Sequence, residues 1–322
     1  MFEFLKCFDT SPLILTEGSV GLRLANEFGL TPDKQIMYAS LIYESRGRQA
    51  LEHIYGQYLR VAMELSLPIL LMTNTRRVNK ERALNSPYKN REIISDYADF
   101  LREVTAKYGR EVYIGGYMGC KGDGYTGEGS LTREAAETFH AWQIEAFERS
   151  SIDFIMTSIM PNVDETIGLA RAIEKSSYPY LISFMIRESG TVIDGSTIHD
   201  AIGAVEGAVK RRPLCYMTNC VHPRILKHAL RRNDTALVRS RFMGIQSNAA
   251  YLSPEELEGS VETKSSGADE LADEVVALDR EFPLKIYGGC CGTDDTHIRE
   301  FASRLCRTDS CRPFAVDTKS CL

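Results

Sequence analysis

The sequence lacks the features that mark several large classes of protein. No apolar run approaches the length of a membrane span, and the first residues show no basic segment followed by an apolar one, so we expect no signal peptide. Lysine and arginine form no block, and the net charge is −6. Neither nucleic acid nor an anionic membrane is therefore expected as a partner.

Two common catalytic signatures are also missing. The glycine-rich segment 115–129 lacks the Gly-Lys-Ser/Thr of a phosphate loop, which argues against nucleotide binding. The chain contains no His-Glu-x-x-His, which argues against a zinc hydrolase of that type.

Composition and cysteine usage indicate an ordinary cytoplasmic protein. The hydrophobic fraction of 43% and the charged fraction of 25% are typical of globular proteins. The nine cysteines are odd in number and irregularly spaced. With no export signal, this usage predicts a reducing cytoplasm and thiols that are free or metal-bound.

Short apolar runs alternate with amphipathic stretches along the chain. Eight runs read as strands: 13–15, 69–73, 112–116, 154–157, 180–186, 214–218, 242–246 and 284–287. This alternation predicts a closed (β/α)8 TIM barrel, a single α/β domain over residues 1–305 followed by a C-terminal tail over 306–322. The alternative, an open doubly wound sheet, lacks its strand-Gly-x-Gly-x-x-Gly-helix unit.

Three cysteines stand where predicted strands end. Cys290 and Cys291 are adjacent within a Gly-Gly-Cys-Cys-Gly segment after the eighth strand, and Cys220 follows the sixth. In a barrel such positions share one mouth, where these enzymes act. Three thiolates and one vacant position describe a catalytic zinc site. A closed four-cysteine site, buried thiols, and a fourth ligand from His222 remain open.

A site of thiolates favours one kind of chemistry. All-thiolate ligation keeps a further, substrate thiolate electron-rich while zinc lowers its pKa. We therefore expect attack by a substrate thiolate on an activated alkyl carbon, because nitrogen and oxygen ligands better suit the activation of water.

These residues resemble a known family. The matching segments are 17–21 (Glu-Gly-Ser-Val-Gly), 73–75 (Thr-Asn-Thr), 183–184, 218–220 (Thr-Asn-Cys), Asn248 and 288–293 (Gly-Gly-Cys-Cys-Gly-Thr). They resemble the homocysteine S-methyltransferases, zinc-dependent barrels that include betaine and S-methylmethionine transferases. The resemblance implies Cys220, Cys290 and Cys291 as ligands of Zn²⁺. It also implies methyl transfer from an onium donor to homocysteine, giving methionine.

The substrate shell departs from the family pattern. Glu17 stands where the family usually has aspartate, and Thr157-Ser158 stand where a glutamate associated with the homocysteine amino group is usual. Arg76 and Arg77 replace a typical phenylalanine position.

We nevertheless expect substrate contacts around the mouth. The expected substrate-binding residues are Glu17, Thr73, Asn74, Thr157, Asn219 and Asn248. Arg76, Tyr117 and Tyr125 are candidate contacts for the donor or for a carboxylate. Tyr125 belongs to the glycine-rich segment, which we read as a lid or as a loop with no special role.

Three other functions remain open. The same chemistry would serve a thiol other than homocysteine, or the chain would be one subunit of a multi-protein methyl-transfer system. The third is a non-catalytic zinc- or thiol-binding barrel. The expected partners are a small-molecule thiol and a methyl donor, and the oligomeric state is open.

Overall fold

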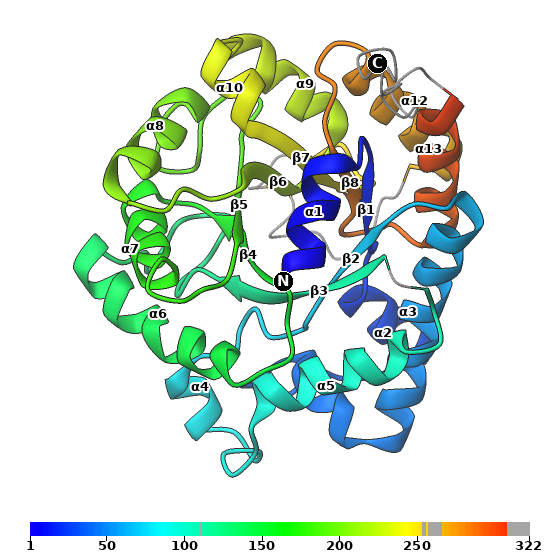
Figure 1. Cartoon of the computed structure of the whole chain (residues 1–322), viewed down its shortest axis with the longest axis vertical. Coiled ribbons are helices and arrows are strands. Elements are labelled where there is room, and N and C mark those ends of the chain that lie inside the picture. The colour runs from blue at the N-terminus through cyan, green and yellow to red at the C-terminus, as the bar shows by residue number, and fades with distance from the viewer. Residues whose placement is uncertain (110, 253–255, 257–265, 308–322) are drawn as a thin grey trace, which may run out of the picture.

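Eight parallel strands close into a barrel in the computed structural model, which describes residues 1–109, 111–252, 256 and 266–307 (Figure 1). Each strand pairs with the next in the chain, and β8 pairs with β1. The strands are β1 (Ile14–Thr16), β2 (Ile69–Met72), β3 (Val112–Gly119), β4 (Phe154–Met160), β5 (Tyr180–Phe184), β6 (Cys215–Val221), β7 (Phe242–Ser247) and β8 (Ile286–Gly289). The predicted TIM barrel is confirmed.

Helices surround the barrel as an outer ring (Figure 1). They are α2 (Gly21–Phe28), the 3-10 helix η1 (Tyr38–Tyr43), α3 (Ser45–Leu65), α4 (Lys80–Leu84), α5 (Ile93–Thr105), α6 (Arg133–Glu148), α7 (Val163–Ile173), α8 (Ile198–Ala208), α9 (Pro223–Arg232), α10 (Ala236–Arg241), α12 (Ala268–Asp279) and α13 (Asp295–Arg307). Several begin at a side-chain cap: Thr132, Asn162 and Thr197 each accept a backbone N–H of the first turn. No helix in the described residues is long and apolar enough to cross a membrane.

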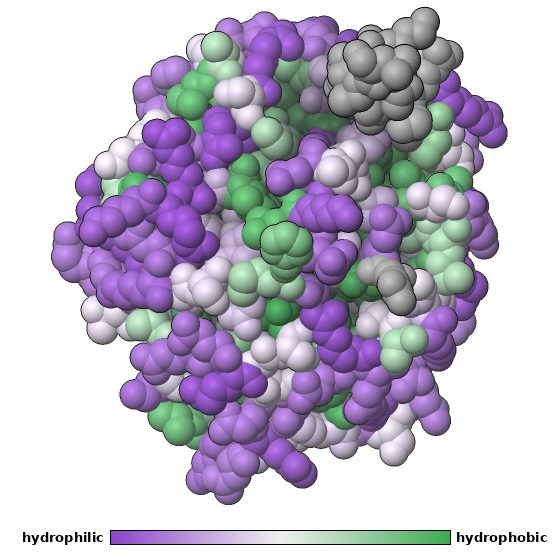
Figure 2. Space-filling view, in the orientation of Figure 1, coloured by the Kyte–Doolittle hydropathy of each residue, from purple (hydrophilic) through white to green (hydrophobic). Residues whose placement is uncertain are grey.

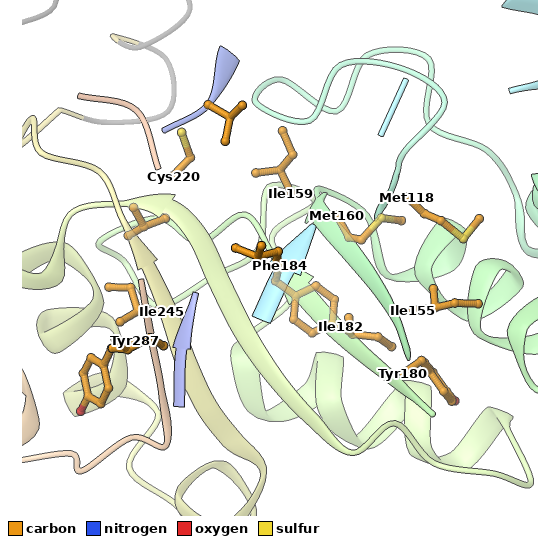
Figure 3. Packing of buried hydrophobic residues seen from close by; sticks show 14 of the residues in the cluster. Met118, Ile155, Ile159, Met160, Tyr180, Ile182, Phe184, Cys220, Ile245 and Tyr287 are labelled. Atoms are coloured by element: carbon orange, nitrogen blue, oxygen red, sulfur yellow. The ribbon is translucent and has the colours of Figure 1, made fainter. Parts of the chain in front are cut away.

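The main hydrophobic core fills the layer between the strands and these helices. Its side chains come from the outward faces of the strands, for example Ile155, Ile182 and Ile245, all fully buried. Figure 3 shows Cys220 and Ile159 at one end of this layer and Tyr180 and Tyr287 toward the other. Because helices cover the outside of the barrel, its strands are buried on both faces and read as apolar runs.

A helix that the sequence analysis did not predict closes the other end of the barrel. Helix α1 (Phe2–Thr10) lies across the centre of the barrel in Figure 1, where Figure 2 shows hydrophobic residues among a hydrophilic surround. Phe4 stacks on Phe154 with ring centroids 4.5 Å apart. Cys7 and Cys215 are buried in this second cluster, far from any role as ligands. The barrel therefore has a closed floor and one open mouth.

Most differences from the predicted strands lie at their carboxyl ends. Strands β3, β4 and β6 run three residues further than the apolar runs that predicted them. Some of these extra residues, such as Ser158 and Asn219, are polar and line the cavity at the mouth, so an apolar pattern does not extend over them. The sequence of residues 253–256, Ser-Pro-Glu-Glu, predicts a capping box at the start of a helix, but residues 253–255 lie outside the described part of the chain. The structure describes only the first two residues of the predicted 306–322 tail, and both belong to α13.

Candidate metal centre and substrate cavity

The carboxyl ends of the strands surround a cavity of about 280 Å³. Residues from the ends of seven strands, β1 to β4 and β6 to β8, line it, and they include Cys220, Cys290 and Cys291. The size suits a small molecule. The structure thus brings the three cysteines into one cavity at the predicted mouth.

The three sulfurs form a tight group. Their Sγ atoms all lie within 4.8 Å of one another, and those of Cys220 and Cys291 are 3.3 Å apart. A disulfide would need a sulfur–sulfur distance of about 2.05 Å, so the thiols are not bonded to each other. Among the described residues this is the one group of three or more metal-binding side chains.

Local backbone geometry aims these sulfurs at the cavity. Cys220 has a φ of +63°, which is uncommon for a residue other than glycine. It lies at an irregularity in the pairing of β6 with β7, between Asn219 and Val221. Such a bulge re-aims a side chain. On the other side, the Cys290 N–H donates to the Ser247 carbonyl at 2.8 Å, which ties the cysteine pair to β7.

Glycines let the cysteine pair approach β1. A side chain on Gly288 would collide with Thr16, and one on Gly289 would collide with Thr293. The Thr293 hydroxyl also donates to the Cys290 carbonyl at 2.8 Å. Glycine at positions 288 and 289 and threonine at 293 therefore allow the close packing around the cysteine pair.

The proton distribution in the group favours one thiolate. Hydrogen bonds from Cys290 and Cys291 hold the pKa of Cys220 well below its usual range. The same contacts raise the pKa of Cys290 and of Cys291. His222 does not join the group: its Nδ1 accepts the Arg224 N–H at 3.2 Å and caps α9.

Tyr125 reaches the sulfurs from the glycine-rich loop. Its hydroxyl donates to Cys220 Sγ at 3.1 Å, and its side chain lines the cavity. Glu165, a fully buried residue of α7, accepts the Lys121 N–H at 2.7 Å and the Leu131 N–H at 3.0 Å. This carboxylate anchors both ends of the loop. The sequence analysis missed Glu165, because its spacing from the loop carries no signal.

Glu17 is buried at the end of β1. Both of its carboxylate oxygens lie near the Met72 N–H, at 3.2 and 3.3 Å. Burial raises the pKa of Glu17 to about 8. The carboxyl group is therefore neutral at pH 7 unless a cation enters the cavity.

A polar network joins Asn219 to the opposite wall. Its Oδ1 accepts the Ile159 N–H at 3.0 Å and the Ser183 hydroxyl at 2.6 Å. Its Nδ2 donates to Ser158 Oγ at 2.9 Å and to the Tyr117 hydroxyl at 3.3 Å. Asn219 lines the cavity, but these partners use its hydrogen-bonding capacity.

At the end of β4 the structure places one of the predicted substrate-binding residues in the barrel wall. Thr157 does not line the cavity: it is fully buried, and its hydroxyl lies 3.4 Å from the Ser183 N–H in the wall between β4 and β5. Its neighbour Ser158 lines the cavity instead. Successive side chains of a strand point to opposite faces, so neighbouring residues differ in whether they line the cavity or pack in the barrel wall.

Most of the other predicted residues line the cavity, and some of them also form hydrogen bonds within the protein. Thr73 and Asn74 line the cavity, but the Thr73 hydroxyl accepts the Tyr117 N–H at 3.0 Å and Asn74 donates to the Tyr97 hydroxyl at 3.0 Å. Asn248 lies behind the sulfurs, with Nδ2 at 3.7 Å from Cys220 Sγ. Arg76 and Tyr117 line the cavity.

Two further lining residues lie at the start of η1. Met37 and Tyr38 line the cavity beside Gly21. Met37 has a φ of +53°, which turns the chain toward the mouth. No strand run or polar pattern marks this segment, so the sequence analysis missed it.

Comparisons with known proteins agree with this geometry. A sequence profile of the family described as homocysteine S-methyltransferase matches residues 14–305. A search among curated proteins gives no match. Crystal structures of the homocysteine methyltransferase MmuM from Escherichia coli are similar in fold. The oxidized form has a TM-score of 0.73 at 18% identity, covering 92% of this chain and 97% of that chain. The metallated form has a TM-score of 0.73 at 17% identity, covering 93% and 98%.

Proposed function

The chain belongs to the homocysteine S-methyltransferase family, and from this premise we propose that it holds Zn²⁺ through Cys220, Cys290 and Cys291. Membership makes it a methyltransferase with homocysteine as the acceptor. We further propose that the methyl donor is an onium compound, either a sulfonium such as S-methylmethionine or a quaternary ammonium such as betaine, and that the product is methionine.

The convergence of the three sulfurs carries the proposal. Zinc–sulfur bonds of about 2.3 Å in a tetrahedron separate the sulfurs by about 3.8 Å, and the three Sγ atoms here lie within 4.8 Å of one another. Thiolates are ligands that zinc prefers. The sulfurs line an open cavity, which leaves room for a substrate thiol beside them. The residues present therefore fit the ion.

Zinc bound there would lower the pKa of the acceptor thiol and keep it an electron-rich thiolate. The residues of the chain supply position and a desolvated setting. The network around Asn219 fixes the wall of β4 and β6, and Tyr125 covers Cys220 from the loop. Holding donor and acceptor together in a site that excludes water accounts for much of the rate of such transfers.

Glu17 and the aromatic side chains suit an onium donor. A cation that enters the cavity favours the ionised form of Glu17 and is attracted by it. Tyr38, Tyr117 and Tyr125 line the same cavity, and aromatic faces attract onium methyl groups. We assign donor binding to this side of the cavity.

A chelation experiment tests the proposal. Purified protein with zinc, homocysteine and either donor should form methionine, detected by mass spectrometry. A chelator should abolish the reaction, and added zinc should restore it. Methionine formation that survives complete removal of zinc would contradict the metal assignment.

The proposal also covers the cellular compartment and the extent of the catalytic barrel along the chain. All seven cysteines in the described residues are free, which supports a reducing cytoplasm as the place of action. We propose residues 1–305 as the catalytic barrel and 306–322 as a tail.

A further inference from the structure

Arg76 places an unpaired positive charge in the cavity. Its side chain is half-buried and lines the cavity with the three cysteines. In the part of the chain that the structure describes, it donates no hydrogen bond and forms no ion pair. Its neighbour Arg77 also lines the cavity, but Nη1 of Arg77 donates to the Gly122 carbonyl at 2.9 Å. A guanidinium has five N–H donors, and those of Arg76 are available to a ligand.

The backbone around Arg76 holds this side chain in place. The Thr75 hydroxyl donates to the Tyr117 carbonyl at 3.0 Å and fixes the segment to β3. The aliphatic part of Arg76 passes over Gly119, where an added Cβ would lie 2.7 Å from Arg76 Cγ. Glycine at position 119 therefore makes room for the arginine.

The guanidinium shares its cavity with the sulfurs. Arg76 from the loop after β2, Tyr117 from β3 and the three cysteines line the same cavity of about 280 Å³. A small ligand bound there is therefore exposed to both Arg76 and the cysteine group.

No ionised carboxylate of the described chain balances this charge. Among the described residues that line the cavity, Glu17 is the one carboxylic acid, and burial raises its pKa to about 8. Ser158, at the cavity end of β4, is uncharged. The cavity therefore favours a ligand that brings an acid group to Arg76.

We propose that Arg76 binds the acid group of the thiol acceptor, so that the enzyme recognises acceptors as short mercapto acids through their carboxylate rather than through their amine. This rests on the proposed function, because it places the acceptor sulfur at the cysteine group. Guanidinium and carboxylate form two parallel hydrogen bonds. Homocysteine carries its carboxylate a few bonds from its sulfur, and the cysteines and Arg76 line one cavity of small-molecule size.

Three thiol ligands separate the contributions of the carboxylate and of the amine to binding. Homocysteine has both, 4-mercaptobutyrate lacks the amine, and 3-aminopropane-1-thiol lacks the carboxylate. Isothermal titration of the zinc-loaded full chain measures each dissociation constant without any methyl donor. We expect 4-mercaptobutyrate to bind within about 5-fold of homocysteine, and 3-aminopropane-1-thiol to bind about 10- to 100-fold more weakly.

Variants of Arg76 test the assignment directly. Arg76→Gln should weaken both acids by about 10- to 100-fold and the aminothiol by less than about 3-fold. Arg76→Lys keeps the charge but loses the paired geometry, so its loss should be intermediate. Arg60→Gln, at an exposed position of α3 outside the cavity, is the control, and it should leave the three affinities within about 3-fold. Gly119→Ala should reproduce part of the Arg76→Gln loss by displacing the arginine.

Clear outcomes overturn the inference. It fails if Arg76→Gln weakens the acids and the aminothiol equally, or if it lowers the zinc content instead. It also fails if wild-type protein binds the aminothiol as tightly as 4-mercaptobutyrate. If wild-type protein binds the acids in the expected order but forms no methionine with either donor, the proposed reaction is wrong and the assignment of Arg76 stands.

Discussion

The hydroxyl of Tyr125 lies 3.1 Å from the sulfur of Cys220, although 95 residues separate the two in the sequence. Tyr125 belongs to the loop after β3, and Cys220 belongs to β6. The contact therefore couples the position of a loop to a proposed metal ligand. Hydrogen bonds to a charged group are worth about 1.5–3 kcal/mol, which is enough to hold the loop over the cavity.

Removal of this hydroxyl should loosen the loop without loss of the metal. Tyr125→Phe keeps the ring but not the donor, and we expect kcat/KM to fall about 3- to 30-fold. Zinc content should stay unchanged, since Tyr125 is not a ligand. Steady-state kinetics with homocysteine and elemental analysis check both statements. Loss of zinc together with activity would show that the hydroxyl supports the metal site instead.

Glu165 of α7 should hold both ends of the same loop in place. Its carboxylate accepts from Lys121 and Leu131, and His140 Nε2 lies 3.3 Å away. Glu165→Gln keeps the size of the side chain but leaves one acceptor oxygen instead of two. We expect faster hydrogen exchange of amides 121–131 and a lower kcat/KM. Glu134→Gln on the exposed face of α6 is the control, and equal exchange in both variants would refute the anchoring role.

Loss of a proposed ligand should remove zinc and activity but leave the barrel folded. Cys290→Ala and Cys291→Ala each leave two sulfurs, so bound zinc should fall from about one ion per chain toward zero. Circular dichroism should remain that of the wild type, because the cysteines contribute little to the core.

Cys215→Ala supplies the comparison for the ligand variants. This cysteine is fully buried near the floor of the barrel. The variant should retain zinc and activity, with a modest loss of stability of about 1 kcal/mol from the smaller side chain. A normal zinc content in Cys291→Ala would disprove the ligand assignment.

The stability of the folded protein should decrease as the pH rises, because Glu17 then loses its proton. The unfolded chain loses this proton near the ordinary pKa of 4.5, whereas the folded protein keeps it up to about 8. The contribution of Glu17 to stability is therefore full below pH 4.5 and is lost progressively as the pH rises to about 8. Relative to Glu17→Gln, the wild type should lose at most about 1.4 kcal/mol per pH unit in this interval.

Urea unfolding of both proteins at several pH values between 5 and 9 measures this difference. The gap between the two stability curves should widen up to about pH 8 and then stay constant. Parallel curves would mean that Glu17 is already ionised in the folded protein at neutral pH.

Much of the fold was predictable because its signals are local. Seven of the eight predicted strands begin within one residue of their observed start, since apolar runs bounded by polar residues mark strands buried on both faces. The strand ends were less predictable. Residues such as Ser158 and Asn219 are polar because they face the cavity, and polarity conceals a strand from a hydrophobic pattern.

The floor helix and the loop anchor were not predictable in the same way. Phe4 and Phe8 of α1 pack against β-strand residues far along the chain, and Glu165 binds a loop more than thirty residues before it. Neither contact leaves a periodic signal, because each depends on where the closed barrel brings distant segments.

By itself, the sequence determined the alternation of strands and helices, the position of the three cysteines at strand ends, and the family. These properties follow from side-chain types at short spacing, where hydrophobic burial and turn chemistry act. The tertiary structure alone decided which side chains line the cavity, with Ser158 there rather than Thr157. It also buried Glu17, which raises the pKa of that residue to about 8, and it left the Arg76 side chain without a hydrogen-bond partner among the described residues. The direction in which a side chain points and its protonation depend on burial and on neighbours that barrel closure brings together. The spacing of residues along the sequence specifies neither property.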